Sequence, residues 1–201
     1  MSTTVGFLHQ ELVFGRRTRV LAQHVSALLP PGASVLDVGC GDGTIASLIL
    51  LLRPDISIKG IDVLMRPETK IPVDPFDGEH LPCGDKSVDV VSFIDVLHHT
   101  NDPSVLLKEA KRVARSTVVL KDHATGGILA HQTLRFMDWF GNASYGVALP
   151  YNYWPESRWR LTFDATGLRI AQWQSQLGLY PFPASLIFER GLHFVAALGI
   201  E

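Results

Sequence analysis

Three glycines stand at alternate positions in VLDVGCGDGT (residues 35–44), directly after a run of apolar residues. They are Gly39, Gly41 and Gly43. Glycine adopts backbone conformations that other residues avoid, and it lets a ligand lie against the main chain. Where a strand, a tight turn and a helix meet, backbone N–H groups and a helix N-terminus converge, which favours a negatively charged or polar ligand group. The glycines alone leave open a second interpretation, a tight connection that binds no ligand.

A carboxylate at the end of the next apolar segment extends this pattern. Asp62 closes SIKGID (57–62) about twenty residues after the turn, where an acidic side chain can accept hydrogen bonds from a ribose diol. The alternative is an aspartate that only begins a turn. A dinucleotide fingerprint would require glycine where Thr44 stands, so a pyrophosphate ligand is disfavoured.

Alternating strands and helices must position these residues. Runs of β-branched and apolar residues predict strands, and helical spacing of apolar residues between capping and breaking residues predicts helices. The expected strands are 33–38, 57–62, 70–76, 88–95, 116–122, 168–177 and 191–198. The expected helices are 9–29, 44–53, 103–115, 129–141 and 155–167. The segment 70–76 contains two prolines, which suit only an edge strand.

This alternation indicates an α/β fold with a mainly parallel sheet covered on both faces. We expect one domain over residues 1–201, because we find no repeat, low-complexity tract or linker. Within it we expect an N-terminal helical segment (1–32), a core that binds the ligand (33–122), and a region of late strands that covers a substrate (123–201).

Composition excludes several classes of partner. The 201 residues are 46% hydrophobic and 19% charged, with a net charge of −2, so nothing attracts the chain as a whole to nucleic acid or to an anionic membrane. The longest nearly apolar run, IASLILLL, is too short to span a bilayer. The two cysteines lack disulfide or metal-ligand spacing. We therefore expect a soluble, cytoplasmic protein that binds neither nucleic acid nor membrane; its oligomeric state is open.

Four motifs follow one another in an order that resembles a known family. They are VLDVGCGDG, GIDV, FDGEHLP and DKSVDVVSFIDVLHHTNDPSVLLKEAKRVAR. This order is similar to that of class I S-adenosylmethionine-dependent methyltransferases, in particular the type 11 or ubiquinone-biosynthesis-like branch that acts on small molecules. The resemblance covers about residues 20 to 122. It implies a Rossmann-like three-layer fold, with a seven-stranded sheet in the order 3-2-1-4-5-7-6 and an antiparallel seventh strand.

The resemblance also implies a cofactor, S-adenosyl-L-methionine, and the residues that hold it. Gly39, Gly41 and Gly43 match the family's glycine turn. Asp37 matches the acid near the methionine amino group, and Asp62 matches the acid that binds the ribose. Asp77 with Gly78 matches the adenine-contacting position, and Asp95 matches the segment beneath the methionine part.

Two departures from the family pattern concern the scaffold. Residues 63–70 leave little room for the helix that usually joins the second and third strands. The proline-glycine-glycine turn that commonly precedes the fifth strand is missing, because RVARS leads straight into TVVLKD.

Histidines are expected at the same edge of the sheet as the cofactor. Methyl transfer from a sulfonium needs a positioned acceptor and a base for its proton, and histidine has a suitable pKa. His98 and His99 follow the fourth strand, and His123 follows the fifth. His123 is the better candidate for the base, although each histidine could instead be structural. A metal held by Asp95, Asp122 and His123 lacks a further clear ligand, so we expect none.

The segment YGVALPYNYWPESRW (145–159) concentrates aromatic rings. These rings could form the apolar wall of an acceptor pocket, or a satellite cluster that covers the sheet edge. The sequence therefore predicts a methyltransferase that acts on oxygen or carbon of a small molecule. The alternative is a protein that binds S-adenosylmethionine without catalysis and serves as a regulator or partner. Methylation of nucleic acid is disfavoured, because the chain lacks the asparagine-proline-proline-aromatic signature and a basic face.

Overall fold

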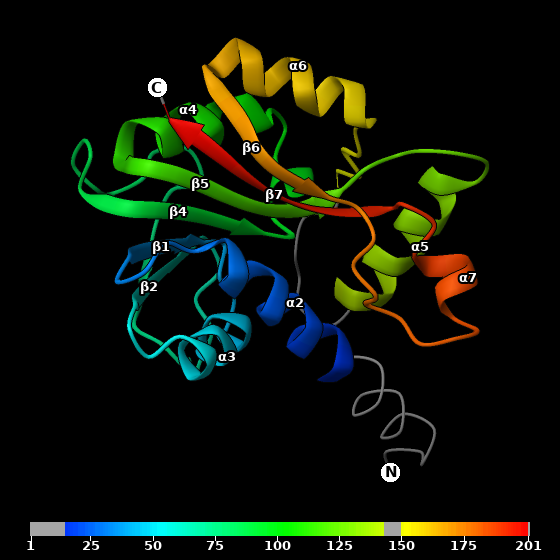
Figure 1. The fold of residues 1–201 in the computed structure, drawn as a ribbon, viewed down its shortest axis with the longest axis horizontal. Helices are drawn as coiled ribbons and strands as arrows, with labels where there is room; N and C mark the ends of the chain where they lie inside the picture. Colours follow the sequence, from blue (N-terminus) through cyan, green and yellow to red (C-terminus); the bar gives the residue numbers. More distant parts are fainter. Residues whose placement is uncertain (1–14, 143–149, 201) are drawn as a thin grey trace.

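A single seven-stranded sheet forms the centre of the computed structural model, which describes residues 15–142 and 150–200 (Figure 1). The strand order is β3-β2-β1-β4-β5-β7-β6. β7 runs antiparallel to both of its neighbours, whereas the other pairs are parallel. The strands are β1 (Ser34–Val38), β2 (Ser57–Asp62), β3 (Val73–Pro75), β4 (Val88–Ile94), β5 (Ala114–His123), β6 (Leu168–Gln174) and β7 (His193–Ile200). The predicted order and the antiparallel seventh strand are confirmed.

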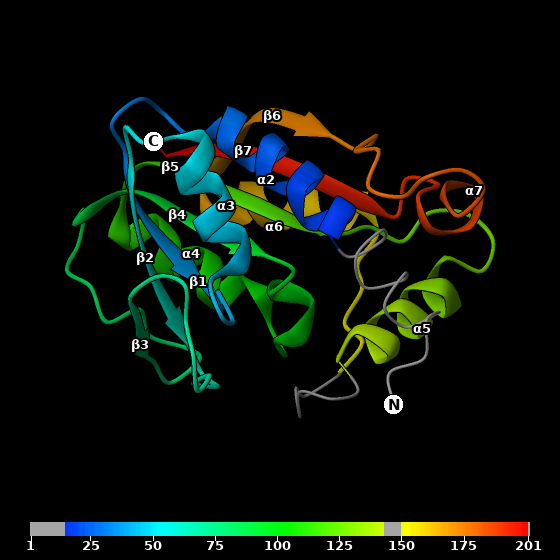
Figure 2. The ribbon, with the colours of Figure 1, turned by 90° about the horizontal axis from the view of Figure 1, so that it is seen from below.

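Helices cover both faces of this sheet, as a three-layer α/β fold requires. The helices of the described residues are α2 (Gly15–Leu28), α3 (Thr44–Leu52), η2 (Leu97–His99, a 3-10 helix), α4 (Pro103–Val113), α5 (Ala130–Asn142), α6 (Glu156–Thr166) and α7 (Ser185–Phe188). α2 and α3 lie on one face, and α4 and α6 lie on the other (Figures 1 and 2). α5 and α7 lie beyond the end of the sheet toward which β4 points (Figure 1).

Alternation along β5 shows how the sequence builds the two cores. Val119 packs in the apolar cluster that contains residues of α2 and α3, whereas Val118 and Leu120 pack in the cluster of α4 and α6. Successive side chains of a strand point to opposite faces. Lys121 and His123 therefore continue the α2 face, and Asp122 continues the α4 face.

The boundary between α4 and β5 differs from the prediction. Asp102 caps α4 by accepting a hydrogen bond from Ser104 N (2.9 Å), as the sequence predicted. The helix ends at Val113, however, and not at residue 115. Ala114 already pairs with Val88 in the sheet, so pairing between strands overrides the helical pattern there.

Two connections bear on the site. The described chain between β2 and β3 contains no helix, as its length predicted, and Lys70 N donates to Asp42 O (2.8 Å) beside the glycine turn. After β6 the chain leaves the sheet at Gln174, earlier than expected, because Leu177 and Leu179 are buried in the α2 and α3 cluster. Of the helices in the described ranges, none combines the length and the apolar character that crossing a membrane requires.

Candidate functional site

The glycine turn between β1 and α3 is shaped partly by packing and partly by open space. All three glycines have positive φ, at 70°, 60° and 74°. A Cβ on Gly39 would lie 2.6 Å from a methyl group of Val96, and one on Gly43 would lie 2.6 Å from Ile71 Cγ1. A Cβ on Gly41 would meet nothing within 4 Å. Close packing of Val96 and Ile71 therefore explains why Gly39 and Gly43 carry no side chain. Of the three glycines, Gly41 is the one that borders space that a ligand could use.

Asp62, at the end of β2, holds this turn in place. Its Oδ2 accepts a hydrogen bond from Gly41 N (2.7 Å), and its Oδ1 accepts one from Leu64 N (2.8 Å). A carboxylate oxygen can accept more than one hydrogen bond, so both oxygens retain capacity for a ribose hydroxyl. The carboxylate is thus both a support for the turn and a polar group at the carboxyl edge of the sheet.

Asp37 is a buried carboxylate with no cationic partner among the described residues. Its residue is 4% exposed, and the hydrogen bond that it accepts comes from Ser92 Oγ at 2.8 Å. Burial raises the pKa of Asp37 to about 7, against the opposing effect of the Ser92 hydrogen bond. A ligand ammonium group at this position would remove the cost of burying the charge. This fits the methionine end of S-adenosylmethionine.

Asp77 and Gly78 lie in an exposed turn after β3. Asp77 Oδ1 accepts hydrogen bonds from Glu79 N (2.8 Å) and His80 N (2.7 Å), and Oδ2 faces His80 Nδ1 (3.0 Å). These donors lower the pKa of Asp77 to about 2. The carboxylate shapes its own turn, and its expected contact with adenine stays a prediction.

Asp95, which follows β4 with φ of 59°, lies between two cations that were not among the predicted site residues. Arg17 of α2 pairs with one carboxylate oxygen, and Lys121 of β5 pairs with the other. Burial alone would raise the pKa of Asp95, but these two cations hold it well below its usual range. Lys121 could have been recognised from the sequence, because a lysine that continues the apolar strand VVLKD is expected to be buried and to need an anionic partner. No comparable pattern distinguishes Arg17.

His98 lies in the turn after β4 and is 1% exposed. Its Nδ1 lies 2.7 Å from Asp122 Oδ1, and Asp122 also accepts hydrogen bonds from Leu97 N (3.0 Å) and His123 N (2.7 Å). Burial opposes a charge on His98, but the Asp122 carboxylate outweighs it and raises the pKa of His98 to about 10. The sequence predicted that His98 and Asp122 lie at this edge, and the structure brings the two side chains into contact.

Asp138 of α5 brings a second carboxylate to the same histidines. Its Oδ1 lies 3.6 Å from His98 Nε2 and 3.7 Å from His99 Nε2. Its Oδ2 accepts a hydrogen bond from the hydroxyl of Tyr153 at 2.8 Å. Asp138 was not among the predicted site residues, although it is the single acidic residue in the helix predicted over 129–141.

His123 reaches this edge on the α2 face. Its ring centroid lies 4.7 Å from that of His98, and its Nε2 lies 3.4 Å from Asp95 Oδ1. His123 Nδ1 is buried without a hydrogen-bond partner among the described residues. Burial, together with Lys121 and His98, holds the pKa of His123 well below its usual value. The structure thus gathers all three histidines of the prediction.

The described part of the aromatic segment, residues 150–159, does not form one pocket wall. Trp154 and Trp159 pack in the core beside Phe163, with the two indole rings 4.9 Å apart, and Trp159 Nε1 donates to His123 O (2.9 Å). For these two rings the pocket interpretation is wrong, because both are buried in the apolar cluster that contains residues of α4 and α6. Tyr153 instead joins the polar cluster, and Tyr145 lies outside the described residues.

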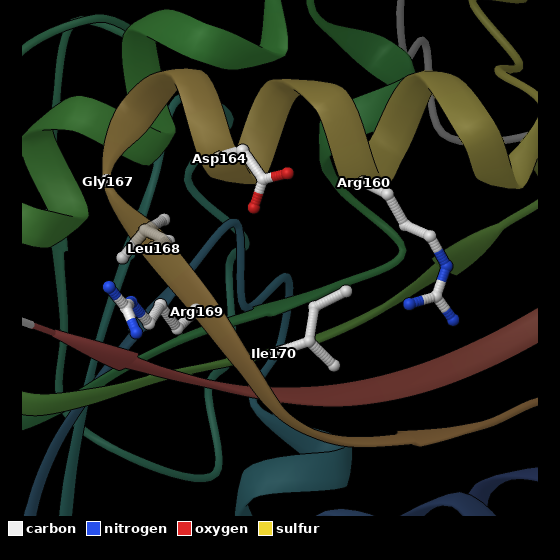
Figure 3. A pocket seen from close by; sticks show the side chains of 6 residues that line it. All are labelled: Arg160, Asp164, Gly167, Leu168, Arg169 and Ile170. Carbon is white, nitrogen blue, oxygen red and sulfur yellow. The ribbon is translucent and has the colours of Figure 1, made fainter.

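A groove elsewhere on the surface lies far from these groups in the fold. It runs between α6 and the first residues of β6 and is lined by Arg160, Asp164 and Arg169 among others (Figure 3). β6 is parallel to β5, so its first residue, Leu168, lies at the amino edge of the sheet. The groove therefore cannot present its side chains to the carboxyl edge, where α/β sheets bind ligands.

Comparison with known proteins agrees with the fold. The sequence profile of a family described as a methyltransferase domain matches residues 13–172. The chain belongs to this methyltransferase-domain family. Its sequence is 31% identical over 146 residues to the 2-methyl-6-phytyl-1,4-hydroquinone methyltransferase of Synechocystis sp. (strain ATCC 27184 / PCC 6803 / Kazusa), covering 68% of this chain and 41% of that protein. The chain spans less than half the length of the curated relatives that it matches.

Solved structures share the architecture at low sequence identity. A chain in the complex of the Haloferax volcanii Trm112 methyltransferase activator superposes with a TM-score of 0.70 at 19% identity, over 96% of this chain and 93% of that one. An S-adenosylmethionine-dependent methyltransferase from Thermotoga maritima superposes with a TM-score of 0.63 at 18% identity, over 99% and 96%. At this identity the likeness concerns the fold of the methyltransferase domain.

Proposed function

We propose that this protein is an S-adenosylmethionine-dependent methyltransferase that methylates an oxygen or carbon atom of a small molecule. The observation that carries the proposal is Asp37, a buried carboxylate without a cation among the described residues, next to a glycine turn whose middle residue borders open space. A cofactor with an ammonium group and a ribose suits this pair of features. The methyltransferase-domain family to which the chain belongs supports the same cofactor.

Each residue of the proposed cofactor site has a distinct task. Asp37 would pair with the methionine ammonium, and Asp62 would accept hydrogen bonds from the ribose hydroxyls. Gly41 would let the ligand lie against the main chain. Asp77 with Gly78 would contact the adenine, and Asp95 would lie beneath the methionine part. When bound, S-adenosylmethionine supplies a methyl group on a sulfonium, which is already activated for displacement.

The proposed acceptor side of the site lies toward α5. His98, His99 and His123 gather there, with the ring of Tyr153 5.6 Å from that of His98. Such a wall combines apolar ring surface with a few polar atoms, which suits a small, partly aromatic molecule. The Synechocystis relative is named for a hydroquinone acceptor, which supports this class of molecule.

Calorimetry tests the cofactor half of the proposal. Titration with S-adenosylmethionine and with S-adenosylhomocysteine should give saturable binding of one molecule per chain. A sample whose circular dichroism shows a folded protein but which binds neither compound would refute the proposal. A metabolite screen that detects S-adenosylhomocysteine then identifies the acceptor, and binding without any turnover would favour a non-catalytic role.

The acceptor half is tested with His123→Ala. We expect slower turnover with unchanged affinity for S-adenosylmethionine, because His123 lies on the histidine side of the edge and not at the glycine turn. The measurement is kcat with the acceptor from the screen, beside calorimetry of the same preparation. Full turnover of the variant would remove His123 from the site.

A further inference from the structure

We propose that His98, His99 and Asp138 bind one divalent transition-metal ion at the acceptor side of the site. One ligand atom from each of the three side chains lies within 4.8 Å of the others. The two histidines come from the turn after β4, and the aspartate comes from α5, which lies beyond the sheet. The set that we did not expect to bind a metal consists of Asp95, Asp122 and His123. No sequence pattern places Asp138 beside the histidines.

The distances between these atoms suit a shared ion better than hydrogen bonds. Charge-assisted N–H···O bonds measure about 2.7–2.9 Å, and His98 Nδ1 reaches Asp122 at 2.7 Å. The Asp138 Oδ1 atom lies 3.6 Å from His98 Nε2 and 3.7 Å from His99 Nε2, and both distances are too long for such a hydrogen bond. Ligand atoms on a tetrahedral ion with bonds near 2.1 Å are separated by about 3.4 Å. A small closure of the cluster around an ion would reach that value.

The surroundings orient the ligands as metal sites commonly do. Asp122 holds Nδ1 of His98, which directs Nε2 toward Asp138. The raised pKa of His98 keeps a proton on Nε2 at neutral pH, so an ion that binds there would displace this proton to solvent. The Tyr153 hydroxyl holds the other oxygen of Asp138. Carboxylate and hydroxyl groups that hold metal ligands in this way fix the tautomer and raise metal affinity. Asp122 is itself fixed by two backbone N–H groups, so the imidazole of His98 has a defined orientation.

A second set of atoms, from Asp95, His98 and His123, meets the same distance criterion but is a poorer site. Asp95 already pairs with Arg17 and Lys121, so a divalent ion there would lie next to two positive charges. Arg17 also attracts the Asp138 carboxylate, but its attraction to Asp95 is the larger of the two. The set on the α5 side therefore meets less opposition from these cations and is the better one.

Ligand chemistry limits which ions would bind. Two imidazole nitrogens and one carboxylate oxygen suit Zn²⁺, Co²⁺ or Fe²⁺, whereas Mg²⁺ and Ca²⁺ prefer oxygen ligands. Three protein ligands leave coordination positions for another molecule. The next step rests on the proposed function. Such an ion would bind a hydroxyl oxygen of the acceptor and lower the pKa of that hydroxyl, which favours oxygen over carbon as the methylated atom.

Metal content of the folded chain tests the site without any need for activity. The protein is stripped with a chelator and dialysed against Zn²⁺, and bound metal is measured by plasma mass spectrometry. We expect about one ion per chain, and visible absorption when Co²⁺ replaces Zn²⁺. Asp138→Asn and His99→Gln should weaken Zn²⁺ affinity by at least about 100-fold. His99 is 18% exposed at its side chain, so its variant keeps the test valid if Asp138→Asn does not fold.

Two further variants separate this site from adventitious binding. His131→Gln removes an exposed histidine of the same helix, α5, and should retain the ion. Tyr153→Phe should weaken Zn²⁺ binding about 10-fold, because it releases one oxygen of Asp138. Substoichiometric metal in the wild type, or equal loss in His131→Gln, would overturn the proposal. Calorimetry with S-adenosylmethionine on the same samples reports separately on the cofactor, so failure of either proposal is distinguishable.

Discussion

Asp37 should make cofactor binding depend on pH near neutrality, because its pKa lies above the range in which ordinary carboxylates lose their protons. Burial raises its pKa to about 7. Below that pH the protonated group cannot pair with an ammonium, so affinity for S-adenosylmethionine should fall as the pH drops from about 8 to about 6. Calorimetry across this range measures the effect. Asp37→Asn should bind weakly at every pH, with a flatter profile.

The same ionisation has an opposite effect on the free energy of unfolding. The folded pKa of Asp37 lies above its unfolded value of 3.8, so the folded state binds more protons between about pH 4 and about pH 7. The contribution of this group to stability is fully present below that range and is lost as the pH rises through it. Asp37→Asn should therefore remove this decline. If the decline is identical in both proteins, the assignment of the raised pKa to Asp37 is wrong.

Asp62 should contribute directly to the affinity for the cofactor. Asp62→Ala should weaken S-adenosylmethionine binding by about 1–3 kcal/mol, because ribose hydroxyls and the N–H of Gly41 lose their acceptor. Asp85→Ala serves as a matched control, since Asp85 is an exposed aspartate that pairs with Arg112 away from the turn. Calorimetry that finds equal affinity for both variants would contradict the role of Asp62.

How far the site could be predicted depends on where a residue stands in the sequence. Asp62, His98 and His123 lie at or shortly after the ends of predicted strands, and topology alone puts the carboxyl ends of parallel strands together. Asp138 and Arg17 lie on helices, and no periodicity tells which helix residue faces the sheet edge across a long connection. The sequence therefore predicted which strand ends meet at this edge, but it could not predict the carboxylate of Asp138 or the guanidinium of Arg17, which helices bring to it.

At the scale of elements, the turn after β1 packs against the turn after β4. Gly39→Ala should destabilise the fold, since the new Cβ would lie 2.6 Å from Val96 and the φ of 70° is unfavourable for alanine. Left-handed backbone costs about 1–2 kcal/mol on its own, and the clash adds to it. In Gly41→Ala the new Cβ points into open space, so this variant should lose only the stability that the left-handed backbone costs.

Denaturant unfolding of these two variants, and of Gly39→Ala combined with Val96→Ala, measures the packing contribution. The double variant should recover part of the stability, because truncating Val96 removes the clash but not the unfavourable φ. S-adenosylmethionine binding should be lost in Gly41→Ala despite its milder destabilisation, since its methyl group occupies the proposed ligand space. Equal stability of Gly39→Ala and Gly41→Ala would show that Val96 yields without cost.

Element boundaries show why parts of the fold escaped prediction. All seven strands were found, because runs of β-branched residues in a buried sheet are a strong pattern. The start of β5 was placed two residues late, since the helical spacing of α4 continues into residues whose partner, β4, lies elsewhere in the sequence. α7 was missed because four residues, Ser185–Phe188, are too few for a helical period to show.

At the scale of the molecule, one carboxylate joins three elements that are distant in sequence. Asp95 follows β4 and pairs with Arg17 of α2 and with Lys121 of β5. Lys121 is 0% exposed, so its charge depends on Asp95 for compensation. Burial lowers the pKa of Lys121, against the attraction of Asp95. α2, one of the two helices on its face of the sheet, is thereby fixed at the edge where the cofactor is proposed to bind.

Asp95→Asn should therefore destabilise the protein even without any ligand. Removing one partner of a buried ion pair leaves an uncompensated charge and costs about 3–5 kcal/mol. Urea unfolding in the absence of S-adenosylmethionine measures this loss, and Asp95→Asn combined with Lys121→Met should recover much of it, because the stranded ammonium is gone. If Asp95→Asn alone unfolds like the wild type, its carboxylate does not hold α2 to the sheet. Any loss of cofactor affinity in that variant would then be a direct effect on binding, as the family resemblance implies.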